Sequence, residues 1–150
     1  MKKKVIISAC LLGEYCRYDG KTKVINEVIK AFEDYEIIPF CPEDPLFGTP
    51  RQRINLVKID GENRIITDKT NEDVTQSLED EINSFISKNH DVDTIVLKSK
   101  SPSCGIGTTP ILNNKKEVLG FGNGVAAGIF LKKYSSIKIE DELGYVVQPL

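Results

Sequence analysis

The sequence predicts an α/β fold, with a parallel β-sheet covered by helices on both faces in three layers and with short β-hairpin insertions. Two observations predict it. Apolar runs rich in β-branched residues, typical of strands buried on both faces, occur at residues 5–9, 36–40 and 94–97. Segments with the periodicity of amphipathic helices separate these runs. Such alternation implies right-handed crossovers and a Rossmann-like arrangement of strands and helices.

The length and composition fit one globular domain. With 150 residues, of which 40% are hydrophobic, the chain can bury a substantial core. Neither a repeat nor an interdomain linker is visible, so we expect residues 1–150 to form a single domain. The 20 basic and 22 acidic residues leave a formal net charge of -2, and binding to polymeric nucleic acid is therefore not expected. The oligomeric state does not follow from the sequence.

The apolar runs are too short for a membrane protein. None approaches the ~18 residues of a transmembrane helix, so we expect a cytoplasmic protein without a membrane partner. The N-terminus imitates a lipoprotein signal ending at Cys10, but the apolar stretch before it is shorter than the ~7 residues that a signal core needs. In a reducing cytosol, four cysteines are more typical of metal ligands or redox thiols than of disulfides.

In the first half of the chain, the first strand leads into a turn-rich segment that contains two cysteines. Apolar side chains then recur at helical spacing from Val24 to Phe32, which predicts an amphipathic helix that ends near Tyr35. The second strand leads into Cys41-Pro42-Glu43-Asp44-Pro45, where the prolines predict a rigid, kinked loop.

In the second half, residues 56–67 predict a β-hairpin whose turn extends beyond Asp60-Gly61 to include Glu62 and Asn63. A second amphipathic helix follows, with Thr70 or Asn71 as its expected N-cap. The remaining predicted elements are a hairpin at residues 111–119, a helix at residues 125–131 and a short strand at residues 137–139.

Each of the three predicted strands leads into a cysteine. Cys10 follows the first strand, Cys41 the second, and Cys104 lies in the loop after the third. If the strands are parallel neighbours, their ends lie on one edge of the sheet, about 5 Å apart from strand to strand. Ligands of open α/β sheets bind at this edge. The pattern therefore predicts a site at which three thiolates share a metal cluster.

A second candidate feature is the glycine-rich entry to the third predicted helix, residues 120–124. The first amides and the dipole of a helix suit a phosphate. However, the spacing is not the dinucleotide-binding fingerprint, and a plain helix start with close packing explains the glycines equally well.

The chain resembles the thiouracil desulfidase family, through motifs that run in order over nearly its whole length. These motifs are Ile7-Ser8-Ala9-Cys10-Leu11-Leu12-Gly13, Arg17-Tyr18-Asp19-Gly20, Cys41-Pro42-Glu43, Pro50-Arg51, Asp73-Val74-Thr75 and Ser101-Pro102-Ser103-Cys104-Gly105. The resemblance implies a 4Fe-4S enzyme that removes sulfur from thiolated uracil. Its partner would be a small-molecule thiolated pyrimidine or its nucleotide, with 4-thiouridine monophosphate as the physiological substrate.

In that family three cysteines hold the cluster, and they correspond to Cys10, Cys41 and Cys104, the cysteines that follow the predicted strands. The family pattern does not demand a cysteine at Cys16. Residues 44–49 depart from the glycine- and leucine-rich segment that is usual there, so we expect the substrate pocket to differ at this point.

The implied mechanism is hydrolytic. Three cysteines on four irons leave one iron open to bind the thiocarbonyl sulfur, so that water attacks the ring carbon and sulfur leaves as hydrosulfide, with no external electron donor. Glu43 is the expected proton-transfer residue, because the matching motif includes it. Ser101 and Ser103 are expected to orient the substrate or the water, although closing a Ser-Pro turn is an alternative role for each.

The resemblance also implies that the substrate can carry a phosphate. Guanidinium groups bind phosphate through two hydrogen bonds, and backbone amides at a helix start also suit it. The candidates are Arg17, Arg51 and the amides near Gly105, Gly107, Gly122, Asn123 and Gly124.

Two other interpretations of the cysteines stay open at this point. In the first, the protein is a noncatalytic module in which zinc or a cluster is purely structural, with Cys16 as the fourth ligand that a closed zinc site requires. In the second, Cys10 and Cys16 are redox partners, although they lack the close Cys-x-x-Cys spacing.

Overall fold

The computed structural model describes residues 2–145, and its centre is a parallel four-stranded sheet. The strands are, in spatial order, β2 (Glu36–Phe40), β1 (Lys4–Ser8), β5 (Thr94–Leu97) and β8 (Lys138–Asp141). β1 is central, because Ser8 pairs with Phe40 of β2 and Ile7 with Val96 of β5. The three strands that lead into cysteines are therefore neighbours and parallel, as the sequence predicts.

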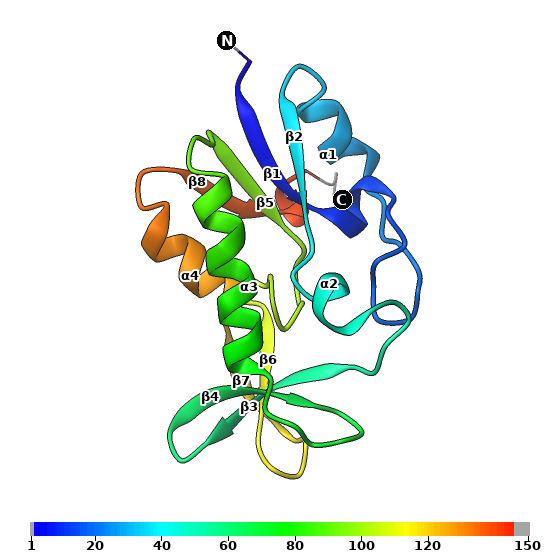
Figure 1. Cartoon of the computed structure of the whole chain (residues 1–150), viewed down its shortest axis with the longest axis vertical. Helices are drawn as coiled ribbons and strands as arrows, with labels where there is room; N and C mark the ends of the chain where they lie inside the picture. The colour runs from blue at the N-terminus through cyan, green and yellow to red at the C-terminus, as the bar shows by residue number, and fades with distance from the viewer. Residues whose placement is uncertain (1, 146–150) are drawn as a thin grey trace, which may run out of the picture.

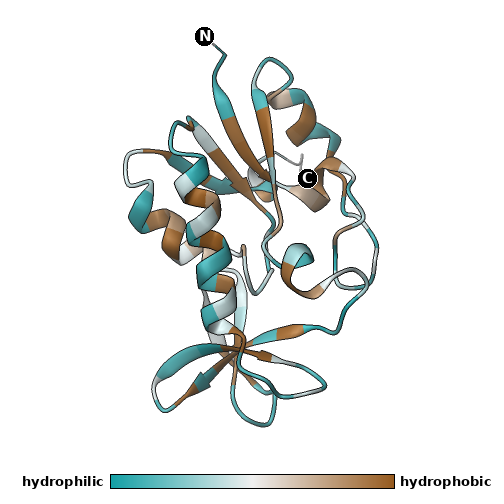
Figure 2. Ribbon diagram, viewed as in Figure 1, coloured by the Kyte–Doolittle hydropathy of each residue, from teal (hydrophilic) through white to brown (hydrophobic). Residues whose placement is uncertain are grey.

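Helices cover both faces of this sheet, which confirms the three-layer α/β prediction (Figure 1). α1 (Asn26–Ala31) lies on one face, and α3 (Thr75–Lys88) and α4 (Val125–Lys133) lie on the other. The alternation of side chains along each strand feeds both layers. In β1, Val5 packs in the cluster that includes Val28 of α1, whereas Ile6 packs in the one that includes Leu78 of α3. Figure 2 shows the apolar central strands and the apolar stripes of the helices.

The two predicted hairpins both form, and together they build a second sheet. Its order is β4 (Glu62–Thr67), β3 (Ile54–Ile59), β6 (Thr109–Leu112) and β7 (Val118–Gly122). A parallel pairing of Leu56 with Ile111 joins the hairpins. The expected longer turn in the first hairpin is wrong, because Ile59 pairs directly with Glu62. Asp60 and Gly61 alone form the turn, with φ of 51° and 82°, typical of the two-residue hairpin loop.

Short helical elements differ from the prediction. The expected kinked loop after β2 contains α2 (Asp44–Phe47), which accommodates Pro45 in its first turn. Two 3-10 turns, at Ala9–Leu12 and Glu142–Gly144, follow β1 and β8. The expected N-cap of α3 is also wrong: the helix begins at Thr75, and the side chain of Asp73, rather than Asn71 or Thr70, accepts hydrogen bonds from the Thr75 amide and hydroxyl.

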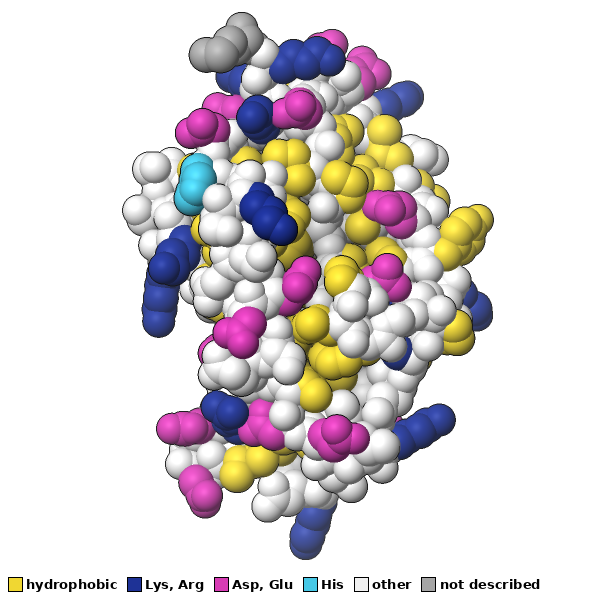
Figure 3. All heavy atoms as spheres, viewed as in Figure 1, with side chains coloured by type: hydrophobic (Ala, Val, Ile, Leu, Met, Phe, Trp, Pro, Cys, Tyr) yellow, Lys and Arg dark blue, Asp and Glu magenta, His cyan; other side chains and the backbone are white. Residues whose placement is uncertain are grey.

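The surface carries both signs of charge. Figure 3 shows acidic and basic side chains interspersed over the visible face, with apolar side chains between them. Within residues 2–145, none of the helices has the length and apolar character needed to span a bilayer.

Candidate functional site

The carboxyl ends of β1, β2 and β5 meet at one cavity of about 770 Å³, and the cysteines line it. Cys10 lies in the 3-10 turn directly after β1, and Cys41 directly after β2. Cys104 reaches the same cavity from the loop after β5, and Cys16 from the segment after the 3-10 turn. All four thiols are free, and three of them are buried. The arrangement brings together the thiols that the strand ends select, with Cys16 beside them.

Hydrogen bonds within residues 101–109 fix the position of Cys104. The Ser101 hydroxyl oxygen accepts the amides of Ser103 and Cys104 at 3.2 and 3.1 Å, which is the turn-closing role. The Ser101 carbonyl accepts the Thr109 hydroxyl at 2.6 Å. On the other side, Gly124 lies so close to the Ser103 carbonyl carbon that a Cβ would be 2.6 Å from it. The cysteine loop is therefore clamped between its own serine and the start of α4.

Burial and mutual pairing set the thiol pKa values in opposite directions. Burial raises the pKa of Cys10 to about 11, partly offset by the nearby Lys98 ammonium, and burial also raises the pKa of Cys104. A hydrogen bond from the Cys16 thiol lowers the pKa of Cys41 to about 7 and raises that of Cys16. The protonated Cys41 thiol also donates to the Cys16 carbonyl at 3.8 Å. One proton is thus lost readily from this pair, whereas Cys10 and Cys104 need a cation to ionise.

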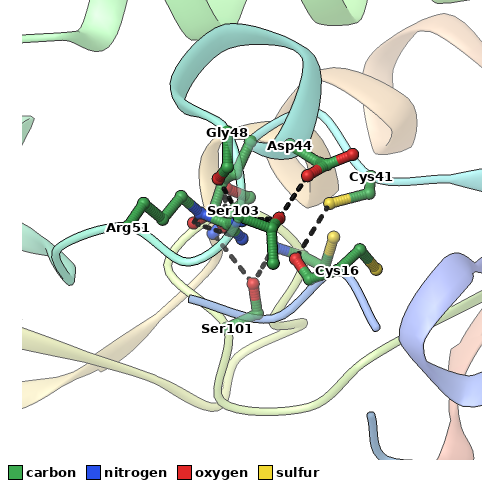
Figure 4. Close-up of polar contacts among 10 residues, drawn as sticks. Cys16, Cys41, Asp44, Gly48, Arg51, Ser101 and Ser103 are labelled. Atoms are coloured by element: carbon green, nitrogen blue, oxygen red, sulfur yellow. Dashed lines mark hydrogen bonds and ion pairs between the residues drawn. The ribbon is translucent and has the colours of Figure 1, made fainter. Parts of the chain in front are cut away.

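Glu43, two residues after Cys41, lies between two donors. Its Oε2 accepts the hydroxyl of Ser103 at 2.8 Å, although Ser103 is 60 positions away along the chain and fully buried. Its Oε1 lies 3.4 Å from the guanidinium of Arg51, whose side chain is only 5% exposed. Figure 4 shows Arg51 and Ser103 converging beside Cys41 and Ser101. The carboxylate is therefore oriented from both sides next to the thiols.

The guanidinium of Arg51 is largely occupied by the protein. One terminal nitrogen donates to the Gly48 carbonyl and the Thr49 hydroxyl, both at 3.0 Å, and the other to Glu43. The Nε–H is buried and makes no hydrogen bond within the described residues, but it lies 3.4 Å from Glu43 Oε1 in the ion pair. The guanidinium therefore serves mainly to hold Glu43 and its own loop.

Sequence reasoning missed a buried ion pair on the cavity wall. Lys98 Nζ lies 3.2 Å from Glu142 Oε2, and Glu142 also accepts the Ser99 amide at 2.7 Å and the Ser99 hydroxyl at 2.8 Å. The sequence gives one local indication that Lys98 lies at the site, since it directly follows the apolar run of β5. It gives none for Glu142, because its partners Lys98 and Ser99 lie 44 and 43 positions earlier in the chain.

The expected phosphate contacts separate into two groups. Arg17 and Arg51 line the cysteine cavity, whereas the five residues from the glycine-rich segments do not. Three of their amides already have protein acceptors: Gly105 donates to the Ser101 carbonyl, Gly107 to the Asn123 side chain and Gly124 to the Gly105 carbonyl. Gly122 pairs with Thr109 in the second sheet. The first amides of α4 donate to the Pro102 and Ser103 carbonyls, so this helix start binds the cysteine loop.

The cavity is basic, in contrast to the chain as a whole. Six cationic side chains line it, and its two carboxylates, Glu43 and Glu142, are both paired with cations. The cations are Arg17, Lys23, Arg51, Arg53, Lys98 and Lys100. A cavity of this charge favours an anionic ligand.

The donor set fits an iron-sulfur cluster better than a single ion. Within residues 2–145, no group of three or more His, Cys, Asp or Glu side chains is arranged to hold one metal ion. Thiolates are the ligands of iron-sulfur clusters, and a four-iron cluster is wider than one ion, so its ligands can come from separate chain segments. The thiols that follow β1, β2 and β5 line one cavity and match that donor set.

Comparisons with known proteins agree with this geometry. The model of the 2-thiouracil desulfurase family matches residues 5–142. Among solved structures, the chain is similar to a [4Fe-4S]-dependent thiouracil desulfidase, TudS, with a TM-score of 0.70 and 30% sequence identity over 94% of this chain and 91% of that one. It is also 27% identical to the uncharacterized protein YbbK of Bacillus subtilis (strain 168), over 95% of this chain and 99% of YbbK.

Proposed function

The chain belongs to the 2-thiouracil desulfurase family, and on that premise we propose that it removes sulfur from a thiolated uracil compound with a [4Fe-4S] cluster held by Cys10, Cys41 and Cys104. The observation that carries the proposal is that these three thiols and Glu43 line one cavity. When bound, the cluster supplies an iron with an open coordination position, a Lewis acid for a soft thiocarbonyl sulfur. Free thiols suit a reducing compartment, and we place the protein in the cytoplasm.

The proposed reaction is hydrolysis. The oxygen of water forms a bond to the ring carbon, the carbon-sulfur bond breaks, and the sulfur leaves as hydrosulfide. The carbon keeps its oxidation state, so no electron donor is consumed. A positioned acid or base is required, because water must lose protons as it attacks and the leaving sulfur must gain one.

Glu43 is the residue we assign to proton transfer. Its Oε2 takes a proton from the attacking water, while Ser103 and Arg51 fix the orientation of the carboxylate from opposite sides. Ser101 lines the cavity, and its oxygen accepts two amides, which leaves its hydroxyl hydrogen to donate to the substrate. Ser103 is then a positioning residue, because it acts through Glu43.

We propose 4-thiouridine monophosphate as the substrate. Support comes from the surplus of cations around the cavity, where both carboxylates are already paired. Arg17 is the assigned phosphate ligand. Arg51 is assigned to Glu43 instead, since its terminal nitrogens already bind protein groups.

The test is anaerobic reconstitution with iron and sulfide, followed by incubation with 4-thiouridine monophosphate and no reductant. We expect loss of the thiocarbonyl absorbance, release of one hydrosulfide for each uridine monophosphate formed, and incorporation of ¹⁸O from labelled water at the ring carbon. Faster turnover of the nucleotide than of free 4-thiouracil would support the phosphate contact. A colourless protein that retains one zinc and releases no hydrosulfide would instead indicate a structural metal module.

A further inference from the structure

Residues 17–20, which follow Cys16, form a tight turn that hydrogen bonds hold in place. Gly20 donates to the Arg17 carbonyl at 2.8 Å, and the Asp19 side chain accepts the Lys21 amide at 3.0 Å. Gly20 has a φ of 76°, and a Cβ there would lie 3.9–4.0 Å from Thr49 and Pro50. The turn therefore packs against the loop that carries Arg51.

Tyr18 lies in this turn and is bound through its backbone and its side chain to two different arginines. Its carbonyl accepts the Arg51 amide at 2.7 Å. The guanidinium of Arg53 lies over its ring, 4.7 Å from the ring centroid, and donates to its hydroxyl at 2.5 Å. Both Tyr18 and Arg53 line the cysteine cavity. The proton-transfer chemistry uses neither side chain.

We propose that Tyr18 and Arg53 form the wall on which the pyrimidine ring of the substrate stacks, an inference that rests on the proposed function. Pyrimidine rings stack on aromatic side chains and on guanidinium planes. Because Arg53 already lies over one face of the Tyr18 ring, the substrate ring would stack on the outer face of this pair. The hydrogen bond from the Arg51 amide to the Tyr18 carbonyl connects this wall to Arg51, whose side chain orients Glu43. A ring stacked there occupies the cavity that also contains the thiols and the carboxylate.

The experiment compares two ligands that share a phosphate but differ in the base. Uridine 5′-monophosphate and ribose 5-phosphate are titrated calorimetrically into the reconstituted protein. For Tyr18→Leu we expect the Kd for uridine monophosphate to rise about 10- to 100-fold, the usual effect of losing one stacked base, and the Kd for ribose 5-phosphate to stay the same. Tyr18→Phe keeps the ring and should stay within about threefold of the wild type. Tyr15→Leu is the matched control, since Tyr15 is 72% exposed and does not line the cavity.

Several results would overturn the inference. If Tyr18→Leu raised the Kd for uridine monophosphate and for ribose 5-phosphate equally, Tyr18 would only maintain the turn. If Tyr18→Phe lost as much affinity for uridine monophosphate as Tyr18→Leu, the contact would depend on the hydroxyl and not on the ring. A wild type that binds no uridine monophosphate, or a Tyr18→Leu variant with unchanged affinity, would also contradict it. The proposed function fails separately: a wild type that binds uridine monophosphate through Tyr18 but releases no hydrosulfide would preserve the stacking wall and remove the reaction.

Discussion

The two sheets of the molecule border the same cavity but contribute different chemistry to it. The parallel sheet ends at the cavity with thiols, because β1, β2 and β5 each lead into a cysteine. The second sheet, which has both parallel and antiparallel pairings and is called the mixed sheet below, contributes mainly apolar side chains from β3, β6 and β7. Its edge strand β7 exposes Val118, Leu119 and Phe121. Reactive groups thus gather where parallel strands end together, whereas the antiparallel hairpins shape the space beside them. Changes in the two regions should therefore have different effects.

The largest expected effect follows from Cys104→Ser, at the edge of the parallel sheet. A serine hydroxyl is a hard, poorly ionised ligand, so the variant should lose the cluster and with it all desulfidase activity. Iron and sulfide contents after anaerobic reconstitution measure the loss, and circular dichroism checks that the variant is folded. A folded variant with the iron content of the wild type would contradict the role of this strand end.

Glu43→Gln should preserve the cluster but slow turnover by about 100-fold or more, the usual scale of acid-base catalysis. The amide remains close in size to the carboxylate but cannot accept the proton. Glu33→Gln is the matched control, because Glu33 is exposed and lies outside the cavity. Steady-state rates with iron-loaded protein decide the point, and full activity of Glu43→Gln would remove the residue from the mechanism.

A smaller effect, on the free energy of unfolding, should distinguish Gly124 at the start of α4 from Gly128 inside it. A Cβ at Gly124 would lie 2.6 Å from the Ser103 carbonyl carbon, so Gly124→Ala must shift the cysteine loop and should cost about 1–3 kcal/mol of unfolding free energy. Gly128, inside α4, has no atom within 4 Å of an added Cβ, and Gly128→Ala should stabilise the protein by about 0.5–1 kcal/mol. Urea unfolding of the cluster-free variants measures both values. Equal effects would show that α4 does not clamp the loop.

The smallest effect is expected beside the mixed sheet, where Arg64 of β4 pairs with Asp73. Hydrogen bonding to Arg64 lowers the pKa of Asp73 to about 2, below its usual ~3.9. The pair therefore contributes stability above pH ~3.9, and that contribution is lost as the pH falls through about 2. Because Asp73 is 41% exposed, Asp73→Asn should cost no more than about 1 kcal/mol at pH 6. Urea unfolding at pH 6 and pH 3 measures the difference in unfolding free energy between the wild type and this variant, which should be smaller at pH 3. Loss of the cluster in this variant would contradict the expectation that the mixed sheet does not hold the cluster.

The sequence predicts those parts of the site that depend on local patterns. β-branched runs followed by cysteines identify the three strand ends, and the register of β1 with β2 and β5 confirms that these strands are neighbours. Hydrophobic periodicity likewise places α1 and α3. In each case the signal and the structure lie within the same few residues.

Contacts between distant residues leave no such signal. The hydrogen bond from Ser103 to Glu43 and the ion pair of Lys98 with Glu142 depend on how loops meet in space. The glycine-rich start of α4 carries a real signal, but its amides bind the cysteine loop rather than an external anion. A motif predicts that backbone donors are available, whereas the fold decides which acceptor occupies them.

The central claim is that three thiols from three parallel strands hold the cluster, and that the fourth thiol in the cavity does not. The iron and sulfide contents of Cys16→Ser after anaerobic reconstitution test it most directly. The claim predicts that this variant binds as much iron and sulfide as the wild type, about four of each per chain. A Cys16→Ser protein that binds no cluster while remaining folded would show a site closed by four thiolates, and would contradict the open iron on which the proposed hydrolysis depends.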